Sequence, residues 1–185
     1  MGSIISSYMI IIYIPSIYTG AKIVRDRPFS SYLSSRGGWS WEIFIKSFVI
    51  SLFVVLIFTA YDFAFTGSRF NSSLPIYIII LTILIAPFQC FAEELLFRGF
   101  LMQTVGSWIC VPIVAIVIQA IIFAYLHSYN LIALLSIVCT GTIFGLIAWY
   151  SKGLEISTAM HSANNILSAL TISLSTTITY GIQRK

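Results

Sequence analysis

Long runs of apolar residues, separated by short polar segments, dominate the chain. Several of these runs have the roughly 20 residues that an α-helix needs to cross the hydrocarbon core of a bilayer. The pattern therefore predicts an all-α fold, a multi-pass transmembrane bundle of about six helices. The expected helices cover Ile4 to about Tyr18, about Ile43 to Phe65, Leu74 to about Val105, Cys110 to His127, about Leu131 to Tyr150 and Leu154 to about Leu174.

We expect one membrane-embedded domain over residues 1–185, with a core at about 74–174 that carries the motifs described below. No repeat or low-complexity tract divides the chain, and the first apolar stretch is interpreted as a retained helix because it lacks a basic start. The third segment, at roughly 32 residues, exceeds a perpendicular crossing. We therefore expect it to tilt, to kink near Pro87, to project beyond the membrane and to end at Gly106.

Composition supports the membrane assignment, since 58% of residues are hydrophobic and 9% are charged. A soluble domain carries about 25% charged residues, so that class is excluded. The net charge is +4, but no basic stripe with interleaved aromatic residues occurs, so no nucleic-acid partner is expected. The basic residues gather in one early segment, which the positive-inside rule places in the cytoplasm. These residues are Lys22, Arg25, Arg27 and Arg36, with only Asp26 opposing them.

Counting crossings from that segment places the turns near Gly106 and Lys152 on the same side of the membrane and the C-terminal tail on the other.

Gly141 and Gly145 form a small-xxx-small pair that favours close helix contact. The three cysteines lie in or beside apolar runs without CxxC spacing. We interpret them as small buried apolar side chains and not as disulfides or metal ligands.

Two carboxylates and a guanidinium interrupt the third apolar segment, which has no charge from Leu74 to Ala92. Each ionisable group in hydrocarbon costs at least ~2.5–3.5 kcal/mol, so Glu93, Glu94 and Arg98 should face a protein-lined cavity. Glu94 and Arg98 share a helix face and can pair, while Glu93 is rotated by about 100° toward the cavity. A purely structural ion pair remains an alternative.

Both histidines of the chain lie in apolar helices, His127 at the end of the fourth and His161 early in the sixth. Asn165 shares a face with His161, four residues earlier. His127 could instead be an interfacial cap near a helix C-terminus, and the other two could be interhelical hydrogen-bonding groups. In a simple antiparallel hairpin Glu93 and His127 differ in height by roughly 9 Å, so contact requires tilt and a protruding turn near 106–110.

The motifs EExxxR, FxxxH and HxxxN, in this order on three apolar helices, resemble the CPBP family, also called Abi or type II CAAX prenyl endopeptidases. The resemblance covers about Pro87 to Asn165 and implies a membrane-embedded endopeptidase. Eukaryotic and archaeal members remove the C-terminal tripeptide of prenylated CaaX proteins, whereas many bacterial members are linked to bacteriocin processing or immunity. The matching positions are Glu93, Glu94, Arg98, Phe123, His127, His161 and Asn165.

By this resemblance, Glu93 with His127 activates a water molecule, His161 and Asn165 donate to the oxyanion, and Glu94 paired with Arg98 orients the site. It implies no cofactor. An alternative is Zn²⁺ held by Glu93, His127 and His161, although HExxH is absent. The expected partners are membrane lipid and a peptide or protein substrate, prenylated or otherwise hydrophobic, in a prokaryotic cell membrane. The oligomeric state stays open.

Two other function classes use the same polar residues. A catalytically silent scaffold or bacteriocin-immunity protein would bind a partner through the same polar pocket. A proton-coupled transporter would use the glutamates and histidines as a relay. The transporter would need internal repeats or broken helices, and the sequence shows no convincing repeat.

Overall fold

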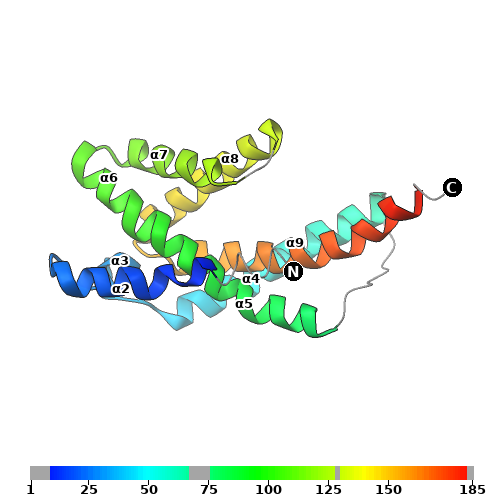
Figure 1. The fold of residues 1–185 in the computed structure, drawn as a ribbon, viewed down its shortest axis with the longest axis horizontal. Coiled ribbons are helices and arrows are strands. Elements are labelled where there is room, and N and C mark those ends of the chain that lie inside the picture. The colour runs from blue at the N-terminus through cyan, green and yellow to red at the C-terminus, as the bar shows by residue number, and fades with distance from the viewer. Residues whose placement is uncertain (1–8, 67–75, 128–129, 183–185) are drawn as a thin grey trace.

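The computed structural model describes residues 9–66, 76–127 and 130–182, and its regular elements there are all helices. This confirms the all-α helical bundle (Figure 1). The expected helix start at Ile4 and the turns and tail over 67–73, 128–129 and 183–185 lie outside the described residues. The elements are α2 (Tyr13–Val24), α3 (Ser30–Leu33), α4 (Trp41–Thr66), α5 (Ile76–Glu94), the π-helix η1 (Leu95–Leu101), α6 (Met102–Ile109), α7 (Pro112–Tyr125), α8 (Leu131–Ser151) and α9 (Glu155–Ile182).

Three of the described helical stretches are long and apolar enough to cross a membrane: Trp41–Phe65, Ile76–Ile109 and Leu131–Ser151. The first of these has none of its most apolar window buried inside the protein. A helix that is apolar all round and unburied needs a non-aqueous solvent. Figure 1 shows α4 running beside α9, away from the other helices. The chain is an integral membrane protein, and its number of crossings stays a prediction.

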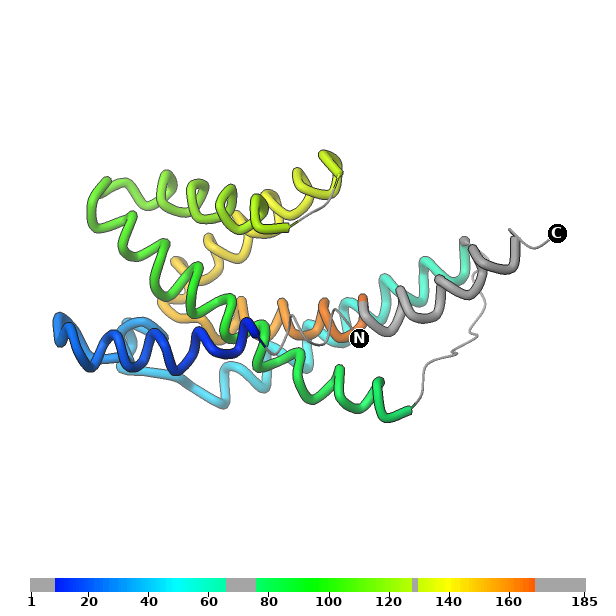
Figure 2. The backbone as a smooth tube through the Cα atoms, in the orientation of Figure 1, coloured from blue at the N-terminus to red at the C-terminus, as the bar shows by residue number. Residues whose placement is uncertain are grey.

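The long third segment is continuous, as expected, but it ends later than the sequence suggested. Figure 2 shows α5, η1 and α6 following one another as a single oblique rod. The expected break at Gly106 is wrong, because Gly106 lies within α6 and faces the Ala115 side chain of α7. The helix ends instead at Cys110, which has a left-handed φ of 58°. α7 begins with Pro112, a residue that suits the first turn of a helix.

Other boundaries also differ from the expected ones. The first helix continues to Val24, not Tyr18, so Lys22 lies on the helix. The last helix continues past Leu174 to Ile182, and α3 was not expected at all. Among the cysteines, Cys90 is buried, but Cys110 and Cys139 are exposed. The interpretation of all three as buried is therefore wrong for two of them.

The expected small-residue contact joins α7 and α8. A side chain at Gly141 would meet the Ala120 Cβ at 3.2 Å, and one at Gly145 would meet the Ile116 Cγ2 at 2.9 Å. Glycine therefore allows the two helix backbones to approach closely, as small residues do between membrane helices. This close approach also brings the backbone carbonyl of Gly141 to the interior of the protein.

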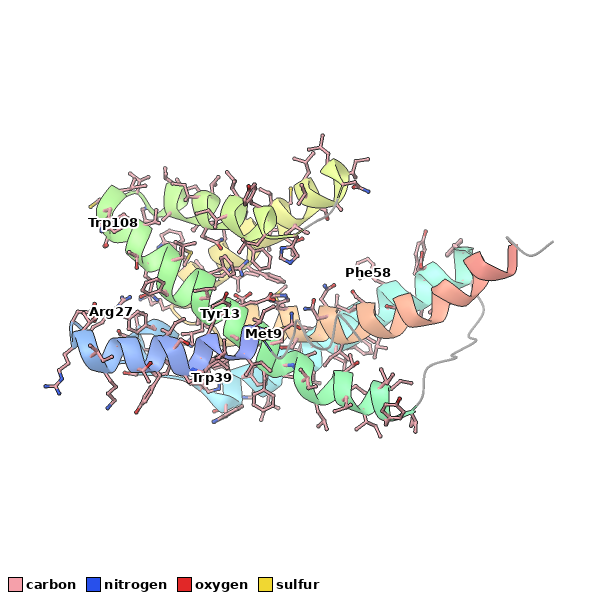
Figure 3. The ribbon with its side chains drawn as sticks, in the orientation of Figure 1. Met9, Tyr13, Arg27, Trp39, Phe58 and Trp108 are labelled. Carbon is pink, nitrogen blue, oxygen red and sulfur yellow. The ribbon has the colours of Figure 1, made fainter. Side chains whose placement is uncertain are left out.

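The early basic segment lies against the turn between α8 and α9. Ser34 forms an isolated bridge with Gly153, and the Leu154 amide donates to the Leu33 carbonyl at 2.9 Å. Arg27, in the turn before α3, and Trp108, near the end of α6, lie at the same end of the molecule (Figure 3). The basic segment and the turns after α6 and α8 therefore share one end, as the count of crossings predicted. Which compartment this end faces stays a prediction.

Gly99 makes the close packing of α3 on η1 testable. A Cβ there would lie 2.7 Å from the Tyr32 backbone carbonyl, which cannot move without shifting α3. We expect Gly99→Ala to lower the free energy of unfolding by about 1–3 kcal/mol, the range for overpacked sites. Thermal unfolding of the detergent-solubilised protein measures this. Gly20→Ala is the control, because no atom lies within 4 Å of its Cβ position. Equal melting temperatures for Gly99→Ala and wild type would contradict this packing.

Candidate active site

The two charged motif partners on the long rod form a fully buried ion pair. Arg98 Nη1 donates to Glu94 Oε1 at 3.0 Å, and both side chains are 0% exposed. The expected pairing of these residues is confirmed. A buried charge without a partner is strongly destabilising, so each member of the pair requires the other.

Arg98 is held from two further helices. Its Nη2 donates to the Gly141 carbonyl of α8 at 3.2 Å, and Gln119 Nε2 of α7 donates to the same oxygen at 3.0 Å. The guanidinium carbon lies 4.8 Å from the centre of the Phe123 ring. A cation over an aromatic face is favourable, more so when it is desolvated. The guanidinium is thus fixed in position.

His161 of α9 contacts both carboxylates. Its Nδ1 lies 3.0 Å from Glu94 Oε1, and its Nε2 lies 3.6 Å from Glu93 Oε2. A carboxylate paired with arginine can only accept, so we assign the Nδ1 proton to this hydrogen bond. Glu93 and His161 are each 6% exposed. Helices that are far apart in sequence therefore bring two acids and an imidazole into one buried cluster.

Glu93 retains one uncommitted oxygen. Its Oε1 accepts from Gln89 Nε2 at 2.9 Å, one helical turn earlier. Its Oε2, which faces His161, is buried and has no hydrogen-bond partner among the described residues. A buried polar atom without a partner calls for an explanation such as a catalytic role. Oε2 is therefore an acceptor that the site leaves available for a ligand, as is Oε2 of Glu94.

His127 joins the site through an aromatic residue. The centre of the Phe123 ring lies 4.8 Å from that of His127 and 6.2 Å from that of His161. His127 Nδ1 lies 2.8 Å from the Phe123 carbonyl oxygen, so this nitrogen donates and must carry a proton. His127 and Asn165 are both half-buried, and Asn165 follows His161 by one turn of α9.

The structure thus brings four of the six expected residues into direct contact, with the other two at the margin. His161 lies at the same level of the bundle as the two glutamates. The reason is that α9 begins beside η1: a Cβ on Gly99 would meet Leu154 Cδ1 at 3.3 Å. His161 therefore lies about as far into the bundle as Glu94. A π-helix directly after the glutamates is also typical of functional sites.

A third buried carboxylate positions the start of α9. Glu155 is 0% exposed; its Oε2 lies 2.7 Å from Arg36 Nη2, and its Oε1 accepts from the Ser40 amide at 2.9 Å. These bonds connect α9 to the segment before α4. The sequence analysis did not single out Glu155, which directly follows a turn at the start of a helix. A lone acid inside an otherwise uncharged stretch was the available signal.

Sequence reasoning also missed Gln89, Gln119 and Phe144. Each amide is an isolated polar residue in an apolar helix, which is a usable signal, since such residues normally find a partner. Phe144, whose ring centre lies 5.5 Å from that of His161, gave no signal, because one more aromatic residue in an apolar helix is ordinary. Contacts between helices decide its role.

The alternative zinc set does not form a metal site in the described residues. Within the described ranges, no group of three His, Cys, Asp or Glu side chains has an arrangement that could hold a metal ion. Glu93 and His161 face one another directly, and the described contacts of His127 lead to Phe123. We therefore derive no step through a metal ion.

Comparison with known proteins identifies the family. The sequence profile named "Type II CAAX prenyl endopeptidase Rce1-like" matches residues 71–167, just over half of the chain. The chain belongs to the Rce1-like family. All six expected site residues fall inside the matched region, so the family resemblance drawn from three short motifs is confirmed.

A relative extends the comparison beyond the matched region. "Uncharacterized protein YyaK" of Bacillus subtilis (strain 168) is 28% identical over 181 residues, which is 91% of this chain and 60% of that protein. The chain therefore spans less than two thirds of the length of this relative. No solved structure matches the chain. The Rce1-like assignment thus rests on sequence, and the site geometry comes from the fold described above.

The Glu94–Arg98 pair can be tested by a double-mutant cycle. Removing the cation in Arg98→Met leaves the buried Glu94 with His161 as its remaining charged partner. We expect a loss of about 3–5 kcal/mol in the free energy of unfolding, the range for a broken buried pair. The double variant Glu94→Gln/Arg98→Met should be more stable than the sum of the single changes implies, since contacting residues couple by about 0.5–3 kcal/mol. Denaturant unfolding in detergent measures all four proteins. Strict additivity would show that the pair contributes no interaction.

Proposed function

We propose that this protein is an intramembrane endopeptidase that hydrolyses a peptide bond of a hydrophobic or prenylated CaaX-type substrate. The observation that carries the proposal is the free, buried Oε2 of Glu93, which faces His161 at 3.6 Å beside the Glu94–Arg98 pair. Membership of the Rce1-like family supports the reaction class. Hydrolysis requires a base for water and donors for an oxyanion, and the cluster contains candidates for both.

Glu93 is the proposed general base. A water molecule that donates to Oε2 would lose its proton to this oxygen as it attacks the carbonyl carbon of the substrate. His127 assists from the margin, because its proton lies on Nδ1 and its Nε2 can accept a hydrogen bond from the same water. When the tetrahedral intermediate collapses, the C–N bond breaks and Glu93 returns the proton to the leaving amine.

His161 and Asn165 are the proposed oxyanion donors. With Nδ1 donating to Glu94, His161 directs its Nε2 toward Glu93 and the substrate side, and in its doubly protonated form it would donate from Nε2 to the oxyanion. Asn165 offers its amide N–H from the next turn of the same helix. Glu94 orients His161. It accepts hydrogen bonds from Arg98 and His161 through one oxygen and so holds the imidazole in place. Donors fixed in advance lower the barrier most when water is excluded.

We place the reaction in a prokaryotic cell membrane, with a peptide or protein terminus as substrate and lipid as the surrounding solvent. The Bacillus relative supports the organism class, and the apolar helices support the membrane. The proposed mechanism assigns its steps to the two carboxylates, the imidazoles and the amide of the described site, with no metal ion. A membrane scaffold that binds through the same residues is the competing outcome of the experiments below.

Glu93→Gln tests the base. The amide keeps the size of the side chain but cannot take a proton, so we expect cleavage of a prenylated CaaX peptide in liposomes to fall by at least ~10²–10⁴-fold. Glu42→Gln is the matched control, because Glu42 is an exposed carboxylate paired with Lys46 on α4. Circular dichroism and elution volume report folding. We expect activity in the presence of a chelator to equal activity in its absence.

Full activity of a folded Glu93→Gln variant would remove Glu93 from the base role. Loss of activity with chelator, restored by Zn²⁺, would instead favour the metal alternative. A scaffold is the remaining outcome if the wild type cleaves no peptide and cells that carry Glu93→Gln behave like cells that carry the wild type.

Asn165→Ala tests the oxyanion donor. Loss of one such donor typically lowers kcat by ~10²–10³-fold, so we expect that decrease with little change in KM. Asn164→Ala is the matched control, since Asn164 is the neighbouring residue and is exposed. Single-turnover cleavage of the same peptide measures both variants. Equal rates for the two variants would show that Asn165 does not contact the developing charge.

A further inference from the structure

A basic cavity of about 690 Å³ lies at the turn between α2 and α3, separate from the glutamate site. Three of its lining residues are cationic, and the lining contains no acidic residue. Arg27 marks its position at one end of the molecule in Figure 3. The cavity is lined by Tyr18, Ala21, Lys22, Arg25, Arg27, Pro28, Phe29 and Ser30.

The two arginines of this cavity are held in place by the protein. Arg25 has a left-handed φ of 57°, and its Nε donates to the Lys22 carbonyl at 3.3 Å. The guanidinium carbon of Arg27 lies 3.8 Å from the centre of the Tyr32 ring, and its Nη1 donates to Gln103 Oε1 at 2.7 Å. Arginines fixed in this way lose less conformational entropy when they bind an anion, and their planar fork suits a phosphate.

The positive charge of the cavity is only partly neutralised. Asp26 is the carboxylate nearest in sequence, and its Oδ2 lies 4.0 Å from Arg27 Nε. The Asp26 side chain is 52% exposed, so its field is screened by solvent. Arg27 Nε itself is buried and has no hydrogen-bond partner in the described part of the chain. The excess of cations over acids around the cavity indicates an anionic ligand.

Apolar surface directly beside the cations points to a lipid as the source of that anion. Ile23 and Val24, on the last turn of α2, are 80% and 70% exposed. They end an apolar helical stretch, Met9–Val24, along which acyl chains can lie. Tyr18 lines the cavity, and its ring packs edge-on against Phe29 at 5.2 Å, as aromatic residues do at headgroup level. A free phosphate ion would make no use of this apolar surface.

We propose that the cavity binds the phosphate headgroup of an anionic phospholipid, whose acyl chains run along α2. Clusters of lysine and arginine beside membrane helices attract such headgroups. Lys22, Arg25 and Arg27 supply the charge. This site does not depend on the peptidase function, since it shares no residue with the glutamate cluster.

The experiment measures lipid binding to the purified protein by native mass spectrometry. The probes are phosphatidylglycerol and phosphatidylcholine with identical acyl chains. We expect wild type to retain phosphatidylglycerol in preference to phosphatidylcholine, and Lys22→Gln/Arg25→Gln/Arg27→Gln to lose that preference. Each cation near an anionic lipid surface contributes roughly fivefold in affinity, so the affinity of the triple variant for phosphatidylglycerol should fall by roughly 100-fold. The control is Lys46→Gln/Lys152→Gln, which removes two exposed cations away from the cavity.

Single changes keep the test valid if the triple variant does not fold. Arg25→Gln alone should weaken phosphatidylglycerol binding by roughly fivefold, and circular dichroism reports the fold. Competition with inorganic phosphate separates the two sources of the anion: we expect displacement only at concentrations far above that of the lipid. Equal binding of the two lipids to wild type, or an effect of the control variant as large as that of the triple variant, would overturn the proposal. Displacement by phosphate at the lipid's own concentration would also overturn the lipid assignment.

Discussion

One buried carboxylate constrains most of this structure. Glu94 is 0% exposed in an apolar bundle, and its Oε1 accepts from both Arg98 and His161. A charge in that position is tolerated only with a well-placed partner and further hydrogen bonds. The requirement fixes α9 against α5, because His161 must reach Glu94. It also fixes η1 against α8, because Arg98 completes its own bonds on the Gly141 carbonyl.

The same constraint leaves Glu93 in an unusual position. Its neighbour has taken Arg98 and the His161 Nδ1, so Glu93 keeps only Gln89 as a hydrogen-bond donor in the described residues and faces the remaining imidazole nitrogen. Two adjacent carboxylates thereby acquire different environments. Enzymes that use two acids separate their roles in this way, through surroundings and not through residue type.

Packing outside the cluster sets how far the cluster lies inside the helix bundle. Glu155 and Arg36 secure the first turn of α9, and Gly99 allows α3 and the α8–α9 turn to lie close to η1. Gly141 and Gly145 do the same for α7 against α8. Gly153 leaves room for the Ser34 and Arg36 side chains. Because lipid offers no hydrophobic drive for helices to associate, such close contacts and buried polar bonds must supply the association energy.

The sequence by itself determined the helical class, the membrane environment, the family and the six candidate residues. It could do so because hydrocarbon requires long apolar helices, and because polar groups are too costly there to be incidental. It also predicted the Glu94–Arg98 pair, since residues four apart share a helix face. Only the tertiary structure decided that Glu94 binds His161, that α9 starts beside Gly99, and that Gln89, Gln119, Phe144 and Glu155 support the site. These contacts join helices distant in sequence, and their depth and rotation depend on how the helices pack, which periodicity along one helix does not encode.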